Sequence, residues 1–248
     1  MSNRIFTAAV IIIGDEILSG RAQDTNLRDI ALSLERWGVR VAEARVIPDA
    51  EDAIVAAVNE LRFRHNYVLT TGGIGPTHDD ITAASIAKAF GVELVEHPTI
   101  AALIRQREAP PEIMASRLRM AMTPTGAGLV ENATGGPPGF FVGNVYVLAG
   151  IPKVMRAMLA SLEGKLTGGA VVQSRTVTAY VGESTIAEPL RKLQAAHPDI
   201  QIGSYPFLDA DRFGTTLIMR GVDSDLLDEL RAKIEQMLVA VGVQPVRE

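Results

Sequence analysis

The sequence predicts an α/β protein in which a parallel sheet is followed by a smaller α+β domain. Over the first two thirds of the chain, short apolar runs alternate with segments in which apolar residues recur every three to four positions. Such alternation is typical of strands joined by helices in a parallel sheet. Residues 163–169 hold three glycines and are predicted to be a linker. The expected domains are therefore residues 1–165 and 170–248.

The first domain is predicted to begin with a buried strand at residues 6–13. The apolar period of residues 27–37 predicts a helix that begins at the Asp24-Thr25 cap and ends at Gly38. A later, polar helical region is broken by Pro110-Pro111. The remaining strands are expected at residues 39–46, 66–69, 92–95, 129–131, 140–142 and 144–148, and the remaining helices at residues 50–63, 81–90 and 153–162.

The second domain is predicted from a change of pattern after the linker. Residues 171–181 alternate between apolar and polar side chains, like a strand with one exposed face. A helix, two strands and a longer helix follow, which gives a β-α-β-β-α order. These four elements are expected at residues 184–196, 200–204, 215–220 and 225–241.

The composition limits the classes of protein to which the chain can belong. It has 248 residues, of which 47% are hydrophobic and 21% charged, values typical of a globular protein with a sizeable core. The formal net charge of −5 argues against a nucleic-acid partner, which usually requires a basic face. The absence of cysteine excludes disulfides, thiolate catalysis and cysteine-ligated zinc.

The apolar run at residues 8–13 follows Arg4 and superficially resembles a signal peptide. The run is short, and an acidic pair follows it with no cleavage-site pattern, so a buried strand is the better interpretation. No segment approaches the roughly 20 apolar residues that a membrane-spanning helix requires. We therefore expect no membrane contact and a location in the cytoplasm.

The most informative segment is residues 70–82, TTGGIGPTHDDIT, between a predicted strand and a predicted helix. Gly72, Gly73 and Gly75 lack a Cβ, so the turn can adopt positive φ and let a ligand approach the main chain. The first amides of the following helix have no partner within the helix, and the helix dipole adds positive potential. This combination is typical of anion sites, and of phosphate sites above all.

Two acidic residues in the same turn, Asp79 and Asp80, would repel a phosphate on their own. A divalent cation would remove that conflict, because magnesium binds one or two carboxylates together with phosphate oxygens. The turn therefore predicts a metal-assisted phosphate site with Asp79 and Asp80 as metal ligands. A tight turn with an acidic cap on the helix is the alternative that these residues leave open.

The segment TTGGIGPTHDDIT resembles the signature of the MoaB/Mog, or molybdopterin-binding, domain. It has the form found in the competence/damage-inducible protein A (CinA) family and in the N-terminal domain of eukaryotic-type FAD synthases. Four further segments resemble the family in the same order, and the resemblance covers about residues 5–162. These segments are residues 14–26, 47–49, 132–140 and 148–155.

The resemblance implies a fold, a MoaB/Mog-like parallel-sheet sandwich followed by a small α+β, KH-like domain. Residues 202–206, IGSYP, resemble the KH-like middle domain of the CinA family. No GxxG loop lies between helices there and the domain has no basic stripe, so RNA binding is not expected. Relatives of this fold commonly form oligomers, so a homodimer or homotrimer is expected.

The resemblance also implies which residues form the site. Asp49 and Asp80 match the two acidic positions most associated with catalysis, and Asp79 belongs to the CinA and FAD-synthase forms. The substrate is expected at the carboxyl ends of the strands, where ligands bind parallel sheets. The residues expected to contact it are Gly14, Asp15, Glu16, Asp24, Asn26, Thr71, Gly72, Gly73, Gly75, Pro76, Thr77, Thr82, Gly135, Gly136, Gly150 and Pro152.

Several of these acidic residues have simpler roles open to them. Asp15 and Glu16 could cap a turn, and Asp24 could be the N-cap of the helix that follows it. His78 could act as a general base, but a hydrogen-bonding role within the loop is the better interpretation.

The sequence departs from the CinA pattern in two segments. The closing loop has Ala149, Ile151 and Val154 where that family more often has Pro, Pro and Glu. Residues 119–121, Arg-Met-Ala, replace its usual Lys-Gln-Ala and look more like the FAD-synthase domain. With neither an amidase nor an adenylyl-transfer domain in the sequence, deamidation of nicotinamide nucleotides and FAD synthesis are not expected.

Carboxylates beside phosphate-binding amides suit metal-assisted attack on a phosphoanhydride, because a metal neutralises developing charge and lowers the pKa of bound water. We therefore expect a metal-dependent nucleotide pyrophosphatase that uses magnesium, manganese or cobalt and acts on ADP-ribose or FAD. A protein of molybdenum cofactor biosynthesis that binds or adenylylates molybdopterin is one alternative. A non-catalytic module that binds a nucleotide or a pterin is the other.

Overall fold

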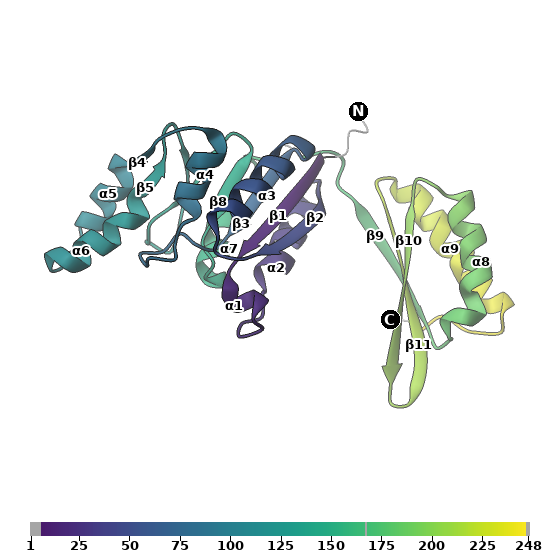
Figure 1. Cartoon of the computed structure of the whole chain (residues 1–248). Helices are drawn as coiled ribbons and strands as arrows, with labels where there is room; N and C mark the ends of the chain where they lie inside the picture. Colours follow the sequence, from purple (N-terminus) through teal and green to yellow (C-terminus); the bar gives the residue numbers. More distant parts are fainter. Residues whose placement is uncertain (1–5, 167, 247–248) are drawn as a thin grey trace. The chain divides into compact units, whose positions relative to one another are not determined.

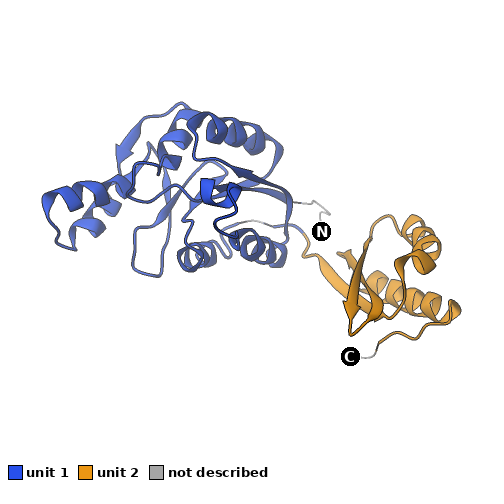
Figure 2. Ribbon diagram, turned by 60° about the horizontal axis from the view of Figure 1, so that its bottom comes forward, with its two compact units in different colours: residues 1–169 blue, residues 170–248 orange. Residues whose placement is uncertain are grey.

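The structure is a computed structural model that describes residues 6–166 and 168–246. The chain divides into two compact units, Met1–Gly169 and Ala170–Glu248, each with its own core (Figure 2). The cavity of the candidate site belongs wholly to the first unit.

The segment predicted to be a linker packs against the first unit. Leu166 is buried in the core of that unit, and the amide of Gly169 donates a hydrogen bond to the carbonyl of Gly38 at 2.9 Å. The boundary between the two units falls directly after the predicted linker at residues 163–169, and the described part of that segment packs with the first unit. Thr167 lies outside the described residues.

The first unit is built on a six-stranded sheet. Its strands are β1 (Phe6–Ile13), β2 (Val39–Ile47), β3 (Tyr67–Thr71), β6 (Gly128–Val130), β7 (Gly139–Val142) and β8 (Val145–Leu148). In space they are ordered β2-β1-β3-β8-β7-β6, and the first four of these are labelled in Figure 1. The first four in that order are parallel, whereas β7 is antiparallel to both of its neighbours. The predicted α/β fold is confirmed, with a mixed rather than wholly parallel sheet.

A two-residue turn, Gly143-Asn144, makes β7 and β8 an antiparallel hairpin. Gly143 has a φ of 56°, which glycine adopts without strain and which short hairpin turns require. Because β6 is antiparallel to β7, it points the same way as β8. The loop after β6 therefore reaches the same edge of the sheet as the loops after β1, β3 and β8.

Helices cover both faces of this sheet (Figure 1). They are α2 (Asn26–Arg36) and α7 (Pro152–Ala160) on one face, and α3 (Glu51–Arg64) and α4 (Thr82–Phe90) on the other. Successive residues of a strand point to opposite faces, so Val10 of β1 packs under the first pair and Ile11 under the second. Burial on both faces explains why residues 8–13 of β1 are an unbroken apolar run.

A smaller layer beyond the sheet carries one wall of the site. It consists of β4 (Leu94–Glu96), α5 (Pro98–Arg105), α6 (Pro111–Leu118), the 3-10 turn η1 (Arg119–Ala121) and β5 (Met122–Pro124). β4 and β5 are an antiparallel pair, and Ile100, Ile104 and Ala121 form a separate buried cluster. The sequence did not predict β5, nor the four-residue helix α1 (Asp15–Leu18), because such short elements show no period.

The second unit has the predicted β-α-β-β-α order. Its elements are β9 (Gln173–Ala179), α8 (Glu183–Ala196), β10 (Gln201–Asp209), β11 (Arg212–Gly221) and α9 (Ser224–Ala240). The strands form an antiparallel sheet in the order β10-β11-β9. Both helices pack on one face of it, where Ile186, Leu217 and Leu230 are fully buried (Figure 1).

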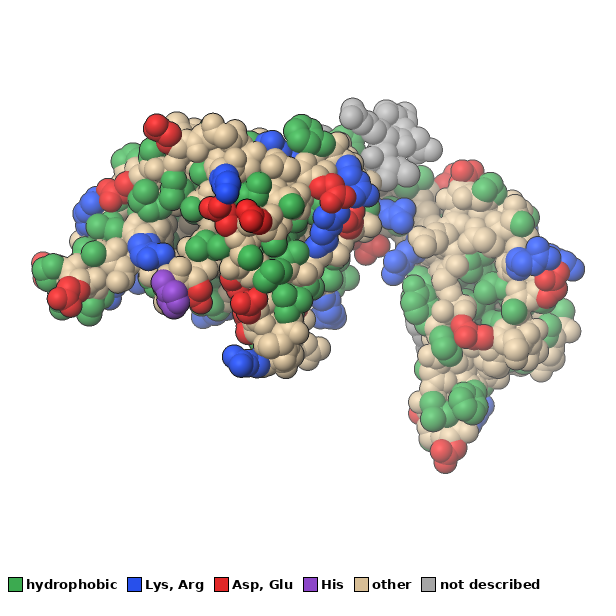
Figure 3. Space-filling model, viewed as in Figure 1, with side chains coloured by type: hydrophobic (Ala, Val, Ile, Leu, Met, Phe, Trp, Pro, Cys, Tyr) green, Lys and Arg blue, Asp and Glu red, His purple; other side chains and the backbone are tan. Residues whose placement is uncertain are grey.

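Two features bear on the partners expected for the chain. Among the described residues, no helix is both long and apolar enough to cross a membrane. Lys and Arg side chains are scattered among acidic ones on the face drawn in Figure 3. The absence of a nucleic-acid partner stays a prediction.

Candidate functional site

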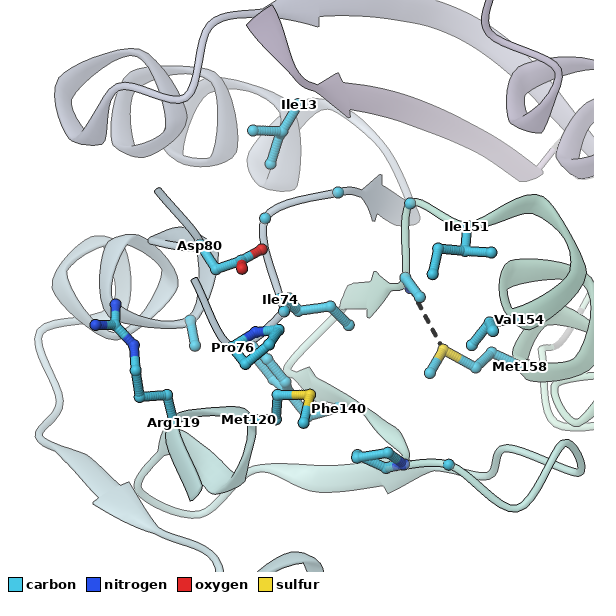
Figure 4. A pocket seen from close by; sticks show the side chains of 18 of the residues that line it. Ile13, Ile74, Pro76, Asp80, Arg119, Met120, Phe140, Ile151, Val154 and Met158 are labelled. Carbon is cyan, nitrogen blue, oxygen red and sulfur yellow. Dashed lines mark hydrogen bonds between the residues drawn. The ribbon is translucent and has the colours of Figure 1, made fainter. Parts of the chain in front are cut away.

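A cavity of about 600 Å³ lies at the carboxyl edge of β1, β3 and β8 (Figure 4). Each of the five segments singled out in the sequence contributes at least one residue to it, including all three acids predicted to be catalytic. The predicted site residues that line it are Gly14, Glu16, Asp49, Gly72, Gly73, Gly75, Pro76, Asp79, Asp80, Gly136 and Gly150.

Two positions after the end of β3, at the floor of this cavity, require glycine. Gly72 has a φ of 105°, and a Cβ there would collide with the carbonyl oxygen of Ile13 at the end of β1. Gly73 has a φ of 66°, and a Cβ there would collide with the hydroxyl of Thr82. The main chain therefore turns at the cavity floor in a conformation and a space that favour glycine alone.

The amides of this turn are divided between the fold and the cavity. The amide of Gly72 donates to the carbonyl of Leu148 at 3.3 Å, so it is not free for a phosphate, contrary to expectation. The amides of residues 73–75 have no acceptor among the described residues, and neither do the first amides of α4 at residues 83–84. Free amides of this kind at a helix N-terminus favour an anion.

Two threonines hold the turn in place. The buried Thr82 donates its hydroxyl to the carbonyl of Gly72 and its amide to the carbonyl of Gly73, each at 3.0 Å. Thr77 donates its amide (2.8 Å) and its hydroxyl (2.5 Å) to the same oxygen, Oδ2 of Asp80. Asp80 is thereby fixed through one oxygen, and Oδ1 has no partner among the described residues.

Asp79 is the most exposed of the three acids. The Thr77 hydroxyl, followed by the amide of Asp79 itself, holds the pKa of this carboxyl below its ordinary value. His78 lies 3.9 Å from it and its side chain is 94% exposed, so His78 points to solvent and not into the cavity. Asp79 is therefore ionised and accessible, as a metal ligand must be.

Asp49 has the opposite electrostatic setting. Burial raises the pKa of its carboxyl above the ordinary value, and the nearby Glu16 carboxylate raises it further. The amide of Asp15, the first residue of α1, donates to Asp49 Oδ2 at 3.0 Å and opposes that rise. This carboxyl is the one best suited to hold or accept a proton.

The acids fit a metal ion only together with a ligand. No group of three or more acidic or histidine side chains among the described residues is placed to hold an ion. Magnesium commonly binds through one or two carboxylates and completes its shell with waters and phosphate oxygens. Asp79 and Asp80, next to the free amides, match this arrangement of two carboxylates with phosphate oxygens.

Across the cavity from Asp80 the lining is apolar, as Ile151, Val154 and Met158 show in Figure 4. We call residues 73–75 with Asp79 and Asp80 the phosphate wall, and we call the apolar side the ring wall. The side chains of the ring wall come from η1, β7, α7 and the N-cap residue of α7. They are Met120, Phe140, Ile151, Val154 and Met158. A wall of this kind suits the flat face of an aromatic ring.

Arg119 also lines the cavity and was not among the predicted site residues. It is exposed, and its side chain forms no hydrogen bond or ion pair among the described residues. The guanidinium lies near enough to Asp79 to lower the pKa of that carboxyl. Figure 4 shows it far from Ile151 and Val154. The sequence offered one signal for it, the departure from the CinA pattern at residues 119–121.

A second cavity of about 130 Å³ is lined by four further predicted residues, Asp24, Asn26, Thr71 and Pro152, and also by Glu16 and Gly150. Asp24 accepts hydrogen bonds from the amides of Asn26 (3.3 Å) and Leu27 (3.0 Å), so it caps α2, one of the two roles left open for it. The buried Asn26 donates its side-chain amide to the carbonyl of Gly150 at 2.8 Å, which ties α2 to the loop after β8.

The other predicted residues support the site without lining either cavity. They are Asp15, Thr77, Thr82 and Gly135. The amide of Gly135 donates a hydrogen bond to the carbonyl of Asn132 (3.2 Å), and the carbonyl of Gly135 accepts one from the Arg107 side chain (3.0 Å). Its amide is therefore not free for a phosphate either.

Two family models match the chain. One, described as “Probable molybdopterin binding domain”, matches residues 9–167, and the other, “FAD synthase, middle domain”, matches residues 171–247. The chain belongs to the molybdopterin-binding domain family. The resemblance that the glycine-rich turn indicated is thereby confirmed. The second unit is similar to the middle domain of FAD synthase.

Relatives of this chain carry the CinA name. A CinA-like protein of Desulfosudis oleivorans is 34% identical over 212 residues, which are 79% of this chain and 51% of the relative. This chain therefore spans about half the length of that relative. A protein of Aeropyrum pernix is 31% identical over 94% of this chain and 91% of its own length.

A solved structure supports the same fold for the first unit. The crystal structure of the protein CinA from Thermoplasma acidophilum is 34% identical to this chain, with a TM-score of 0.59. It covers 66% of this chain and is matched over 99% of its own length. The α/β architecture around the cavity is therefore shared with a CinA protein.

Proposed function

We propose that the chain is a metal-dependent pyrophosphatase that cleaves the phosphoanhydride of a dinucleotide-like substrate, of the ADP-ribose or FAD class. The observation that supports this best is that free amides, three acids and an unpaired arginine share one cavity with an apolar wall. A volume of about 600 Å³ is in the range of small-molecule sites. The FAD-synthase middle domain in the same chain also favours a nucleotide.

The cavity residues have distinct roles in this proposal. The amides of residues 73–75 hold the phosphate that does not react, and Arg119 neutralises its charge. Asp79 and Asp80 hold the magnesium, manganese or cobalt ion, which when bound would offset charge on the phosphates and acidify a water molecule. Asp49 accepts the proton of the attacking water. A bond forms from the water oxygen to phosphorus, the bridging P–O bond breaks, and two phosphomonoesters result.

The family description favours a second candidate, a molybdopterin-binding protein. A pterin could lie on the ring wall with its phosphate at the amides, so the same cavity would serve. A non-catalytic module is the third candidate, and it requires only binding. The three candidates differ in whether a phosphoanhydride is broken, which a direct assay can measure.

The deciding experiment is a hydrolysis screen with the full chain. FAD, ADP-ribose, NAD and dinucleoside polyphosphates are incubated with magnesium, manganese or cobalt, and the products are separated by chromatography. We expect metal-dependent release of nucleoside monophosphate, which a chelator abolishes. A rate equal to that of buffer for every substrate and metal would remove the pyrophosphatase proposal.

Asp80→Asn tests the assignment within that assay. Asn keeps the size and an acceptor for Thr77 but removes the charge, so we expect folding to survive and turnover to fall by at least roughly 100-fold. Asp199→Asn, at an exposed position of the second unit, is the matched control and should leave turnover unchanged. A metal-dependent rate that Asp80→Asn leaves intact would keep the activity but refute the role of Asp80.

The expected homodimer or homotrimer is part of the same proposal. The molar mass of the full chain in solution, measured by light scattering, tests it. A mass equal to that of one chain at assay concentrations would contradict it.

A further inference from the structure

The loop after β8 lies between the two cavities of the first unit. Gly150 lines both of them, whereas Ile151 lines only the cavity of about 600 Å³ and Asn26 only the cavity of about 130 Å³. The peptide that joins Gly150 to Ile151 therefore has α2 on one side and the larger cavity on the other. Whether its carbonyl or its amide faces the larger cavity decides whether an anion is repelled or bound there.

A buried side chain fixes the orientation of this peptide. The side-chain nitrogen of Asn26 donates to the carbonyl of Gly150 at 2.8 Å, and Asn26 is only 5% exposed. A carbonyl can only accept, so the nitrogen of the side-chain amide must face it. Because the C=O and N–H of a trans peptide point in opposite directions, the amide of Ile151 points away from Asn26, to the side of the larger cavity.

The amide of Ile151 has no acceptor of its own. No described residue accepts from it, nor from the amides of Gly136 and Gly150, which line the same cavity. The turns after the neighbouring strands β3 and β8 touch, since a Cβ on Gly150 would lie 3.3 Å from the Cα of Gly72. An anion held at the phosphate wall therefore has a second group of donors next to it.

Packing alone does not account for an asparagine at position 26. Its side-chain oxygen is buried and has no partner among the described residues. An unpaired buried oxygen costs free energy, and this cost offsets what the hydrogen bond to Gly150 contributes to stability. The main effect of the Asn26 side chain is then the orientation of the Gly150 peptide.

We propose that Asn26 is a positioning residue for the second phosphate of the substrate. By holding the carbonyl of Gly150 out of the larger cavity, it directs the amide of Ile151 into the cavity as a donor to that phosphate. The opposite orientation would place a carbonyl oxygen against the phosphate and repel it. This inference rests on the proposed function for the identity of the ligand, and it gives Asn26 a role that requires no contact with the substrate.

Asn26→Asp tests the orientation, because it exchanges a donor for an acceptor. A carboxylate at position 26 repels the carbonyl of Gly150 and accepts from the amide of Ile151, so the peptide should rotate and turn its carbonyl into the cavity. Gly150 has no Cβ to oppose this rotation. Asn26→Ala removes the donor without supplying an acceptor, so the peptide is left free to take either orientation.

The ligands are AMP and the methylene-bridged analogue of ADP-ribose, both with magnesium present. In the analogue a CH₂ group replaces the bridging oxygen, so nothing is cleaved, and the metal offsets the charges of Asp79 and Asp80. Calorimetry on the full chain gives the dissociation constants. We expect the analogue to bind at least about tenfold more weakly to Asn26→Asp and about threefold more weakly to Asn26→Ala, whereas AMP, with one phosphate, changes by less than about twofold.

Asn144→Asp is the matched control. The side-chain nitrogen of Asn144 donates to the carbonyls of Arg62 and His65 at 2.9 and 3.0 Å, so the same exchange is made at the opposite end of β8. It should lower stability but leave both dissociation constants unchanged.

Two results would overturn the inference. One is analogue binding that neither variant at position 26 weakens, and the other is an equal loss in Asn144→Asp, which would show a general loosening of the fold. If Asn26→Asp does not fold, the comparison of Asn26→Ala with the unchanged protein decides alone.

The outcomes separate this inference from the proposed function. Weaker analogue binding in the variants, together with no hydrolysis by the unchanged protein, would refute the pyrophosphatase and keep the positioning role of Asn26. Hydrolysis by the unchanged protein, with analogue binding that neither variant weakens, would do the reverse. Failure of the analogue to bind the unchanged protein would refute both.

Discussion

The phosphate wall and the ring wall face each other across one cavity but are built from different parts of the chain. The phosphate wall is mostly main chain, and its turn is fixed by the ends of three neighbouring strands. The ring wall consists of side chains from a helix, a strand and a 3-10 turn. A site built from main chain requires positions where even a Cβ does not fit. A site built from apolar side chains requires only that their total volume is kept. Equal-sized substitutions on the two walls should therefore have unequal effects.

The largest effect is expected at Gly72. Gly72→Ala would place a Cβ against the carbonyl oxygen of Ile13 at a φ of 105°. Neither the strand end nor the turn can move aside without breaking the sheet edge, so we expect a loss of about 3 kcal/mol or more in the free energy of unfolding. Urea unfolding followed by circular dichroism measures it.

Gly91→Ala is the matched control for that variant. Gly91 is also in the left-handed region, with a φ of 66°, but a Cβ there meets nothing within 4 Å. Its replacement should cost about 1 kcal/mol, the cost of the backbone conformation alone. Equal losses in the two variants would show that the contact with Ile13 has no part in the stability of the turn.

A smaller effect is expected on the ring wall. Val154→Ala removes two methyl groups from a half-buried side chain at the cavity surface, where water can replace them. We expect a loss of about 1 kcal/mol or less in unfolding free energy, because no closed cavity is created. A loss as large as that of Gly72→Ala would mean that this wall, too, is held by tight packing.

The smallest effect is expected at Asp49, and it depends on pH. The raised pKa means that the folded protein binds this proton to higher pH than the unfolded chain, so Asp49 lowers stability as pH rises through that window. Asp49→Asn keeps an oxygen for the amide of Asp15 and removes the charge. The variant should be more stable than the unchanged protein at pH 7, by no more than about 0.5 kcal/mol.

The pH series gives the sign of that effect. The difference between Asp49→Asn and the unchanged protein should shrink as pH falls below about 4, where the aspartate of the unfolded chain is also protonated. Denaturant midpoints at several pH values measure it. Lower stability of the variant at pH 7 would show that the hydrogen bond from Asp15 outweighs the burial of the charge.

Most of the fold could be predicted because its elements are long and periodic. The period of residues 27–37 gave α2, and the apolar run of residues 6–13 gave β1. The mixed sheet was missed although the sequence carries its signal: Gly143-Asn144 is a two-residue hairpin turn between apolar runs. β5 could not be found, because its three residues are fixed by pairing with β4 and not by their own pattern.

The candidate site, too, could be predicted only in part from the sequence. The glycine-rich turn could be predicted, because positive φ and close approach of the main chain select glycine, and glycine is visible in the sequence. The sequence could not show which amides of the turn are free. The amide of Gly72, for example, donates to the carbonyl of Leu148, which is 76 positions away in the chain. Arg119 carries no motif of its own and reaches the cavity only because η1 and β5 fold back beside α4. Side-chain walls are assembled by tertiary structure, so single residues of them look ordinary in sequence.

Trp37, the only tryptophan of the chain, offers an optical consequence of how the first unit ends. It follows α2, packs against the core of that unit, and its carbonyl lies where a Cβ at Gly168 would collide with it. Tryptophan emission, excited where tyrosine does not absorb, therefore reports the melting of the first unit alone. Far-ultraviolet dichroism reports both units. If the two melting curves differ, the units unfold independently, and the emission curve marks when the cavity is lost.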